Sequence, residues 1–182
     1  MLEEFADGIY DRTDTSQELS MKMIDTIGQH IIRTAESRDA EPILTFDHVV
    51  KEDEKRRAFI LQEIERGHCT VAEIDGQVVA YIIMDRNFFG WPFIDLVYVH
   101  SDYRQRGLAA ALMLHIEAQC EEKLFVSTNL SNLQMQRLLE KLGYVISGSV
   151  HNLDEGDPEM FYFKRPVKSV DESGYNTAQY TE

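Results

Sequence analysis

The spacing of apolar and polar residues changes along the chain and divides it into segments with different expected structure. Over residues 40–66 the apolar residues recur mostly every three or four positions, which is typical of helices that bury one face. The elements expected here are a short strand over 29–34, a helix over 40–50 after start signals at Ser37 and Asp39, and a second helix over 53–66 that buries Phe59, Ile60, Leu61 and Ile64.

From residue 69 the period falls to two, the spacing that alternates side chains between the two faces of a strand. Asp75-Gly76 lies between two such runs, and this dipeptide accepts the positive φ angles of a tight two-residue turn. The segments expected are strands over 69–74 and 77–84, a turn segment over 87–92 and a strand over 93–100. This pattern predicts an antiparallel meander.

The second half of the chain returns to helical spacing twice, and a strand follows each helix. Ser131 and Gln134 match a capping box at the start of the second of these helices. The elements expected are a helix over 107–120, a strand over 124–128, a helix that buries Met135, Leu138, Leu139 and Leu142, and two strands over 145–150 and 159–164 that flank a loop over 152–158.

The order β-α-α-β-β-β-α-β-α-β-β predicts an α/β (α+β) fold with one mixed, mostly antiparallel sheet of six to seven strands and about four helices. Because strand, helix and strand form a crossover unit, strands 93–100 and 124–128 should be parallel to each other. We expect one domain over residues 29–167, between a polar N-terminal extension (1–28) and a flexible acidic tail (168–182).

Composition and charge limit the classes of function. The 182 residues are 43% hydrophobic and 27% charged, as in ordinary globular proteins, and no run approaches the roughly 18 apolar residues of a membrane span. The net charge of −14 lacks the basic field that a nucleic-acid binder needs. Neither the two cysteines, Cys69 and Cys120, nor the six histidines have the spacing of metal ligands. Since no secretory signal opens the chain, we expect a cytoplasmic protein. From the charge, the apolar runs and the spacing of cysteines and histidines, we expect no nucleic-acid, membrane or metal partner.

The most informative segment runs from Leu96 to Leu112, where an apolar strand passes through a short basic loop into a helix that begins with small residues. A helix N-terminus offers unpaired N–H groups and the positive end of the helix dipole, which together favour phosphate. Gly107 lets a diphosphate approach the backbone, and Arg104 and Arg106 add positive charge. The same residues fit a plain strand–helix turn with a permissive glycine and two solvated arginines, and the loop alone leaves both interpretations open.

Two motifs resemble those of the GNAT acetyltransferase superfamily. The first, Arg104-Gln105-Arg106-Gly107-Leu108-Ala109, fits the family signature (Gln/Arg)-x-x-Gly-x-(Gly/Ala) and follows an apolar strand. The second, residues 132–144, opens with Asn132 and ends in Glu-Lys-Leu-Gly-Tyr, as in the family. Residues 153–159, Leu-Asp-Glu-Gly-Asp-Pro-Glu, are similar to the ending of a bacterial branch of this family. The resemblance covers about residues 29–165 and agrees with the predicted order of elements.

The resemblance implies a site for acetyl-CoA, as cosubstrate, between two parallel central strands that splay apart. In the family the pantetheine arm pairs with the earlier of these strands, which here offers the main chain of Val97, Tyr98 and Val99. The diphosphate would lie against the amides of Arg104, Gln105, Arg106, Gly107, Leu108 and Ala109. Asn132 matches a cofactor-contacting asparagine of the family, and a role at the helix start beside Ser131 fits it equally well.

The activity implied is transfer of the acetyl group to a primary amine, on a small molecule or a peptide, by direct attack in a ternary complex. The N–H of Val99 is the candidate oxyanion donor, as is usual in the family. Asp95 is the candidate base, because it lies on the same strand in an apolar run that favours partial desolvation of its carboxylate. A substrate-anchoring or structural role for Asp95 fits the sequence equally.

The chain departs from the family pattern at Leu139, where many members carry a tyrosine that protonates the leaving thiolate. Tyr144 and Tyr98 are candidate substitutes; otherwise the thiolate leaves unaided or takes its proton from the substrate ammonium. The alternative hypothesis is a non-catalytic acyl-CoA-binding or sensory module on the same fold. A homodimer is left open.

Four acidic residues crowd the loop between the last two strands: Asp154, Glu155, Asp157 and Glu159. Turn chemistry around Gly156 and Pro158 is one explanation, and an acidic rim that attracts a cationic amine is the other. Upstream, Trp91 and Phe88-Phe89 either line the acceptor side or cap the core.

Overall fold

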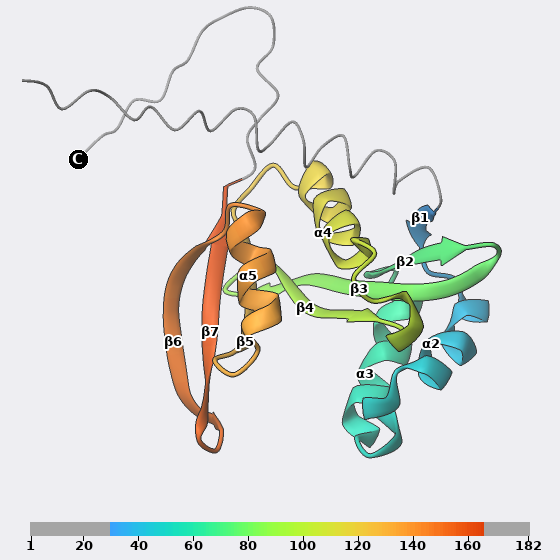
Figure 1. The fold of residues 1–182 in the computed structure, drawn as a ribbon, viewed down its shortest axis with the longest axis horizontal. Helices are drawn as coiled ribbons and strands as arrows, with labels where there is room; N and C mark the ends of the chain where they lie inside the picture. The colour runs from blue at the N-terminus through green and yellow to red at the C-terminus, as the bar shows by residue number, and fades with distance from the viewer. Residues whose placement is uncertain (1–29, 166–182) are drawn as a thin grey trace, which may run out of the picture. The chain divides into compact units, whose positions relative to one another are not determined.

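The computed structural model of the chain describes residues 30–165. These residues form seven strands and four α-helices in the expected order (Figure 1). The strands are β1 (Ile31–Thr34), β2 (Cys69–Ile74), β3 (Gln77–Phe88), β4 (Trp91–Val99), β5 (Leu124–Asn129), β6 (Val145–Asp154) and β7 (Asp157–Lys164). The α-helices are α2 (Ala40–Phe46), α3 (Glu54–Glu65), α4 (Leu108–Gln119) and α5 (Leu133–Lys141), and the short 3₁₀ helices are η1 (Ser37–Asp39), η2 (His48–Lys51) and η3 (Ser101–Tyr103). None of these helices has the length and apolarity of a membrane span. The predicted extension and tail lie outside the described residues.

The strands form one seven-stranded sheet in the order β1-β2-β3-β4-β5-β7-β6. β4 and β5 are parallel and share the register pairs Phe93↔Phe125 and Ile94↔Val126, which confirms the predicted parallel pair. The pairs β1–β2, β2–β3, β5–β7 and β6–β7 are antiparallel. The predicted mixed, mostly antiparallel sheet is therefore correct.

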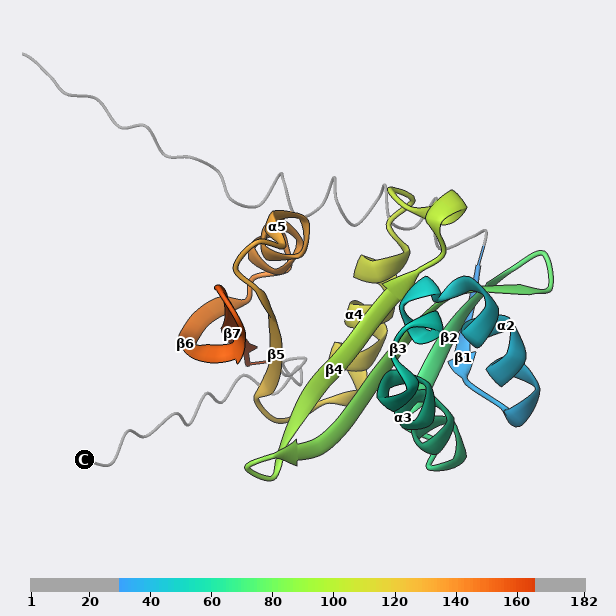
Figure 2. The ribbon, with the colours of Figure 1, turned by 90° about the horizontal axis from the view of Figure 1, so that it is seen from below.

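The described residues divide into two compact units, one of residues 30–83 and 97–112 and one of residues 84–96 and 113–165. In the first unit, α2 and α3 lie on one side of β2 and β3 (Figure 2). Ile43 of α2 and Ile60 of α3 are fully buried, as are Val71 and Ile82 of the strands. Asp75 and Gly76 have φ angles of 51° and 78°, so the predicted tight turn is confirmed.

The helix expected over 40–50 is wrong in its second half, because Asp47 ends α2 after Phe46. Asp47 has an extended backbone (ψ 93°), and its Oδ1 accepts a hydrogen bond from Val49 N at 3.0 Å, which starts η2. Aspartate competes with a helix in this way because its short side chain can bind a backbone N–H two residues ahead. Helical periodicity persists through this break and so hides it.

The second unit departs from expectation at two turns. β3 continues to Phe88 and β4 starts at Trp91, so the turn predicted over 87–92 shrinks to Phe89-Gly90. The loop predicted over 152–158 is likewise mostly strand, and only Glu155-Gly156 separates β6 from β7 (Figure 1). Asn152 has left-handed backbone (φ 65°) and lies where the register between β6 and β7 shifts, between Val150 and Asp154. Such an irregularity lets β6 remain paired with β7 on both sides of the shift.

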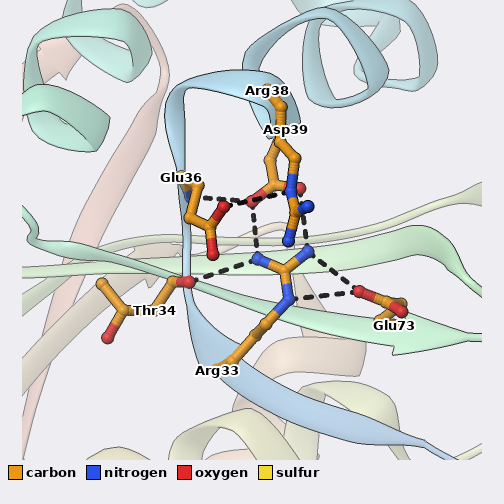
Figure 3. Close-up of polar contacts among 6 residues, drawn as sticks. All are labelled: Arg33, Thr34, Glu36, Arg38, Asp39 and Glu73. Carbon is orange, nitrogen blue, oxygen red and sulfur yellow. Dashed lines mark hydrogen bonds and ion pairs between the residues drawn. The ribbon is translucent and has the colours of Figure 1, made fainter.

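A buried ion-pair cluster ties β1 to η1 and β2 in the first unit (Figure 3). The Arg33 guanidinium donates to both oxygens of Asp39, at 2.7 and 2.9 Å, and to Glu73 Oε2 at 2.9 and 3.1 Å. Asp39 also accepts from Glu36 N at 2.7 Å, and its side chain is only 4% exposed. The hydrogen bonds from Arg33 hold the pKa of Asp39 below its usual value.

We expect Asp39→Asn to lower the free energy of unfolding by about 2 kcal/mol at pH 7, because it breaks a bidentate, charge-assisted contact. A carboxylate whose pKa is depressed by folding stabilises the protein above its unfolded pKa, about 3.9, and loses that effect as the pH falls through the lower folded value. Urea unfolding of both proteins should therefore show a difference that is constant near neutrality and shrinks below about pH 4.

The matched control is Arg38→Ala, which removes an exposed pair with Glu36. It should cost less than about 0.5 kcal/mol, because solvent screens exposed ion pairs. Equal losses from both variants would contradict the importance of the Arg33–Asp39 contact.

Candidate active site

The segment between β4 and α4 folds as a tight loop whose start is fixed by main-chain contacts. His100 N donates to Val79 O of β3 at 2.8 Å, and His100 Nδ1 accepts from Asp102 N at 3.1 Å at the start of η3. Gln105 and Gly107 both have left-handed backbone, with φ of 61° and 78°. Left-handed residues interspersed in a turn direct neighbouring amides toward one side, a geometry that binds anions.

The amides of the Arg104–Ala109 loop are therefore of particular interest. Arg104 N donates to Ser101 O at 3.4 Å, and Ala111 N donates to Gly107 O at 2.9 Å as the first hydrogen bond at the start of α4. Between them, the amides of residues 105–110 have no hydrogen-bond acceptor among residues 30–165. The start of α4 thus offers a run of main-chain donors at the positive end of the helix dipole.

Both loop arginines lie against aromatic rings and are exposed to solvent. Arg104 Nε donates to Val99 O at 3.3 Å, and its guanidinium carbon lies 5.9 Å from the centre of the Tyr98 ring. The guanidinium carbon of Arg106 lies 4.8 Å from the Tyr103 ring. Cation–π contacts at exposed sites restrain a side chain without neutralising its charge. The loop is therefore positively charged in a chain whose net charge is −14.

The main chain of β4 presents donors on the edge that faces away from β3. Backbone N–H groups alternate between the two edges of a strand, and His100 N–H points to β3. The N–H groups of Val99 and Val97 consequently point to the opposite edge. The carbonyl of Val99, on that same edge, accepts from Arg104. This edge carries the parallel pairs with β5 at Phe93 and Ile94.

Tyr98 points from β4 to the face that carries α2 and η2. Its ring stacks against those of Phe46 and Tyr81, with centroids 6.1 and 6.0 Å away, and those two rings also lie 6.1 Å from each other. The Tyr98 hydroxyl hydrogen-bonds His48 Nδ1. No sequence motif predicts this contact with His48, because fifty residues separate the two partners.

The residue that caps α5 is Asn132 and not Ser131, which the capping box predicted. Asn132, not Ser131, is the N-cap of α5, and its Oδ1 accepts from Met135 N at 3.1 Å. Ser131 instead donates through its N and Oγ to the two oxygens of Asp157, at 2.9 and 2.6 Å. The expected capping box is therefore wrong, and the structural role considered for Asn132 is real.

Asp95 is exposed on β4, so the partial desolvation expected from its apolar neighbours is absent. Leu139 is fully buried on α5, where it can only pack. Tyr144 is 3% exposed, and burial, with a contribution from nearby Glu117, raises the pKa of its phenol well above the usual value. A buried phenol of this kind belongs to the core and is a poor proton donor.

Two acidic residues of the last hairpin bind the end of β5 and the segment that follows it. Asp154 accepts from Asn129 Nδ2 at 2.7 Å, and Asp157 accepts from Ser131 Oγ at 2.6 Å.

Phe88 packs in an aromatic cluster with Phe93, Phe125 and Phe161, with centroids 4.9–5.4 Å from its own. Trp91 lies under the ammonium of Lys123 at 5.1 Å. Of the residues described, none form a cluster able to hold a metal ion.

The mixed sheet has one parallel pair, as the resemblance to acetyltransferases implied, and the loop at the start of α4 is rich in main-chain donors. The sequence profile of the acetyltransferase (GNAT) family matches residues 30–144. The chain belongs to this family, and its sheet and helices form the GNAT fold.

Solved structures agree with this assignment. An acetyltransferase of the GNAT family from Bacillus cereus is 32% identical, with a TM-score of 0.71 over 76% of this chain and 99% of that one. Ard1 from Thermoplasma volcanium shares the fold at 19% identity, with a TM-score of 0.68 over 77% of this chain and 99% of its own. The yncA protein of Salmonella typhimurium, solved with its cofactor acetyl-CoA, is 16% identical, with a TM-score of 0.62 over 81% and 99%. A comparison with proteins of curated function gave no match.

We expect Asn132→Ala to lower the free energy of unfolding by about 1 kcal/mol, because α5 loses its N-cap. Asn132→Asp and Asn132→Ser keep an oxygen in the capping position and should stay within about 0.5 kcal/mol of the parent. Urea unfolding measures all three. A loss of acetyl-CoA affinity in Asn132→Ser without a loss of stability would assign the side chain a second, cofactor-binding role; equal stability of all three would contradict the cap.

Proposed function

We propose that the protein is an N-acetyltransferase that moves the acetyl group of acetyl-CoA to a primary amine of a small molecule or peptide, by direct attack in a ternary complex. The observation that carries this proposal is the run of amides at residues 105–110, which has no acceptor among the described residues and lies at the start of α4. Left-handed backbone at Gln105 and Gly107 and the charges of Arg104 and Arg106 make this loop suited to a diphosphate.

In this proposal the loop from Arg104 to Ala109 binds the diphosphate, and the edge of β4 binds the pantetheine arm. The amides of Val97 and Val99 point to the edge opposite β3, which supports this placement. In the same proposal Tyr98 binds the pantetheine arm through its main chain. Asn132 contacts the cosubstrate through its side-chain NH2 group, because its Oδ1 caps α5.

The chemistry follows from the groups on β4. Val99 N–H donates to the oxyanion that forms when the amine attacks the thioester carbonyl. Asp95 takes a proton from the amine, which is largely protonated at neutral pH because its pKa is about 10. Direct attack is favoured over a cysteine-linked intermediate, because burial raises the pKa of Cys69 to about 12 and also raises that of Cys120.

The setting of the reaction is also part of the proposal. Two buried thiols without a disulfide fit the reducing cytoplasm, and the identity with the Bacillus cereus protein supports a bacterial branch of the family. The second candidate function is a non-catalytic acyl-CoA-binding or sensory module, which Leu139 favours because leucine cannot protonate a thiolate. Release of free thiol in the presence of a panel of amines separates the two candidates.

We expect Gly107→Asp to weaken acetyl-CoA binding about 100-fold or more, because a carboxylate at the loop repels the diphosphate. Titration calorimetry measures the affinity. Gly76→Asp is the matched control: Gly76 has the same φ of 78° and lies in the β2–β3 turn, so it introduces the same strain and charge away from the loop. The proposed diphosphate site is refuted if the two variants bind acetyl-CoA equally well.

Asp95→Asn should leave acetyl-CoA affinity within about twofold and lower kcat about 100-fold or more, the usual effect of removing a general base. Asp75→Asn is the control, because it changes an exposed carboxylate at a turn position that asparagine tolerates. Thiol-release kinetics at saturating amine measure kcat. Unchanged turnover in Asp95→Asn would remove Asp95 from the mechanism.

A further inference from the structure

We propose that Tyr98 is the general acid of this chain and that His48 positions it and returns its proton. The inference rests on the proposed acetyl transfer and supplies the proton donor that Leu139 cannot provide. Tyr98 is the better of the two tyrosine candidates, because the Tyr144 hydroxyl is buried in the core of the other unit.

The phenol and the imidazole form a direct pair. Tyr98 Oη and His48 Nδ1 are hydrogen-bonded, and the two ring centroids lie 5.8 Å apart. His48 is exposed, so its ring exchanges protons with water, whereas the Tyr98 ring is only partly exposed. The pair therefore links a half-buried hydroxyl to solvent through one titratable ring.

The surroundings hold the phenol in one direction. The rings of Phe46 and Tyr81 stack against the Tyr98 ring at interplanar angles of 27° and 26° and also contact each other. The guanidinium carbons of Arg56 and Arg104 lie 5.5 and 5.9 Å from its centre. General acid catalysis needs such a fixed donor, because the proton must move along a short and well-directed path.

Asp47 sets the position of His48. The carboxylate of Asp47 is fully buried and accepts from Arg56 Nε at 2.8 Å and from the Tyr81 hydroxyl, while its other oxygen starts η2 at Val49 N. His48 is the first residue of η2, so its place follows directly from that carboxylate. The titratable and charged groups around Tyr98 are thus His48, Asp47, Arg56, Tyr81, Arg104 and His100. The His100 ring is tilted against that of Phe46, with centroids 5.6 Å apart.

Tyr98 is also next to the proposed reaction centre along the strand. Val99, whose N–H is the proposed oxyanion donor, is its neighbour on β4, and Arg104 of the loop touches both residues. The proposal places the leaving sulfur within reach of this hydroxyl.

The step balances as follows. The amine nitrogen forms a bond to the acetyl carbon and gives up one proton, and the carbon–sulfur bond breaks. The leaving sulfur takes the proton of the Tyr98 hydroxyl. The phenolate oxygen then regains a proton through the exposed ring of His48, which receives from the solvent the proton that the amine released.

The central test is Tyr98→Phe, which keeps the stacked ring and removes only the hydroxyl. We expect kcat to fall about 100-fold, within the range typical of general acids, while the affinity for acetyl-CoA and the KM for the amine stay within about twofold. Stopped thiol-release assays give kcat, and calorimetry gives the affinity. Thermal unfolding confirms that the variant is folded.

His48→Gln tests the second half of the pair through the pH profile. A relay through His48 predicts that kcat falls about tenfold and that the alkaline limb of its pH profile moves, because the phenolate is no longer reprotonated by the imidazole. His115→Gln is the matched control: His115 is an exposed histidine on α4 that bonds Gln119. It should leave both kcat and the alkaline limb unchanged.

A fluorinated tyrosine at position 98 provides the conservative rescue. It keeps a hydroxyl that is more acidic than the natural one, so it should restore turnover and move the alkaline limb to lower pH.

The outcomes separate this inference from the proposed function. A parent protein that binds acetyl-CoA but acetylates no amine overturns both. A parent that is active together with a Tyr98→Phe variant within twofold of its kcat overturns the inference alone. Loss of acetyl-CoA affinity in Tyr98→Phe also overturns it, because the hydroxyl would then be a binding group.

Discussion

One buried carboxylate, that of Asp47, determines how the first unit is built. It ends α2, starts η2, and binds both Arg56 of α3 and Tyr81 of β3. Burying a charge is costly unless it is paired and hydrogen-bonded, so these partners must take fixed positions around it. The consequence reaches β4, because Phe46, His48, Arg56 and Tyr81 all contact the ring of Tyr98.

The basic loop solves a problem that the net charge creates. A chain with a charge of −14 repels anions at long range, so a diphosphate site must rely on groups at short range. Main-chain amides at the start of α4 and two exposed arginines provide such groups without a basic surface. Aromatic rings and main-chain carbonyls hold the two arginines in place.

The sequence predicted those features that depend on neighbouring residues. Asp75-Gly76 makes its turn wherever it stands, and the crossover of residues 93–128 can be parallel only. The prediction from sequence failed where contacts with distant residues determine the structure. The helix expected over 40–50 breaks at Asp47, whose Oδ1 binds Val49 N while its other oxygen binds Arg56 and Tyr81. Ser131 loses the cap of α5 because Asp157 takes its hydroxyl. The exposure of Asp95 and the pairing of Tyr98 with His48 depend equally on the folded sheet, which no local motif encodes.

This division bears on which residues the proposed site can lose. Val97 and Val99 offer only main-chain groups, so other residues that keep β4 extended would offer the same donors. Gly107 is different, since its left-handed backbone is strained for any residue with a side chain. Tyr98 is different for another reason. Its hydroxyl is the proposed proton donor, and no backbone group can replace it in that role. The proposed function therefore depends on few side-chain positions. Gly107 matters because its backbone is left-handed, and Tyr98 because its hydroxyl lies at the edge of an aromatic cluster, in contact with His48.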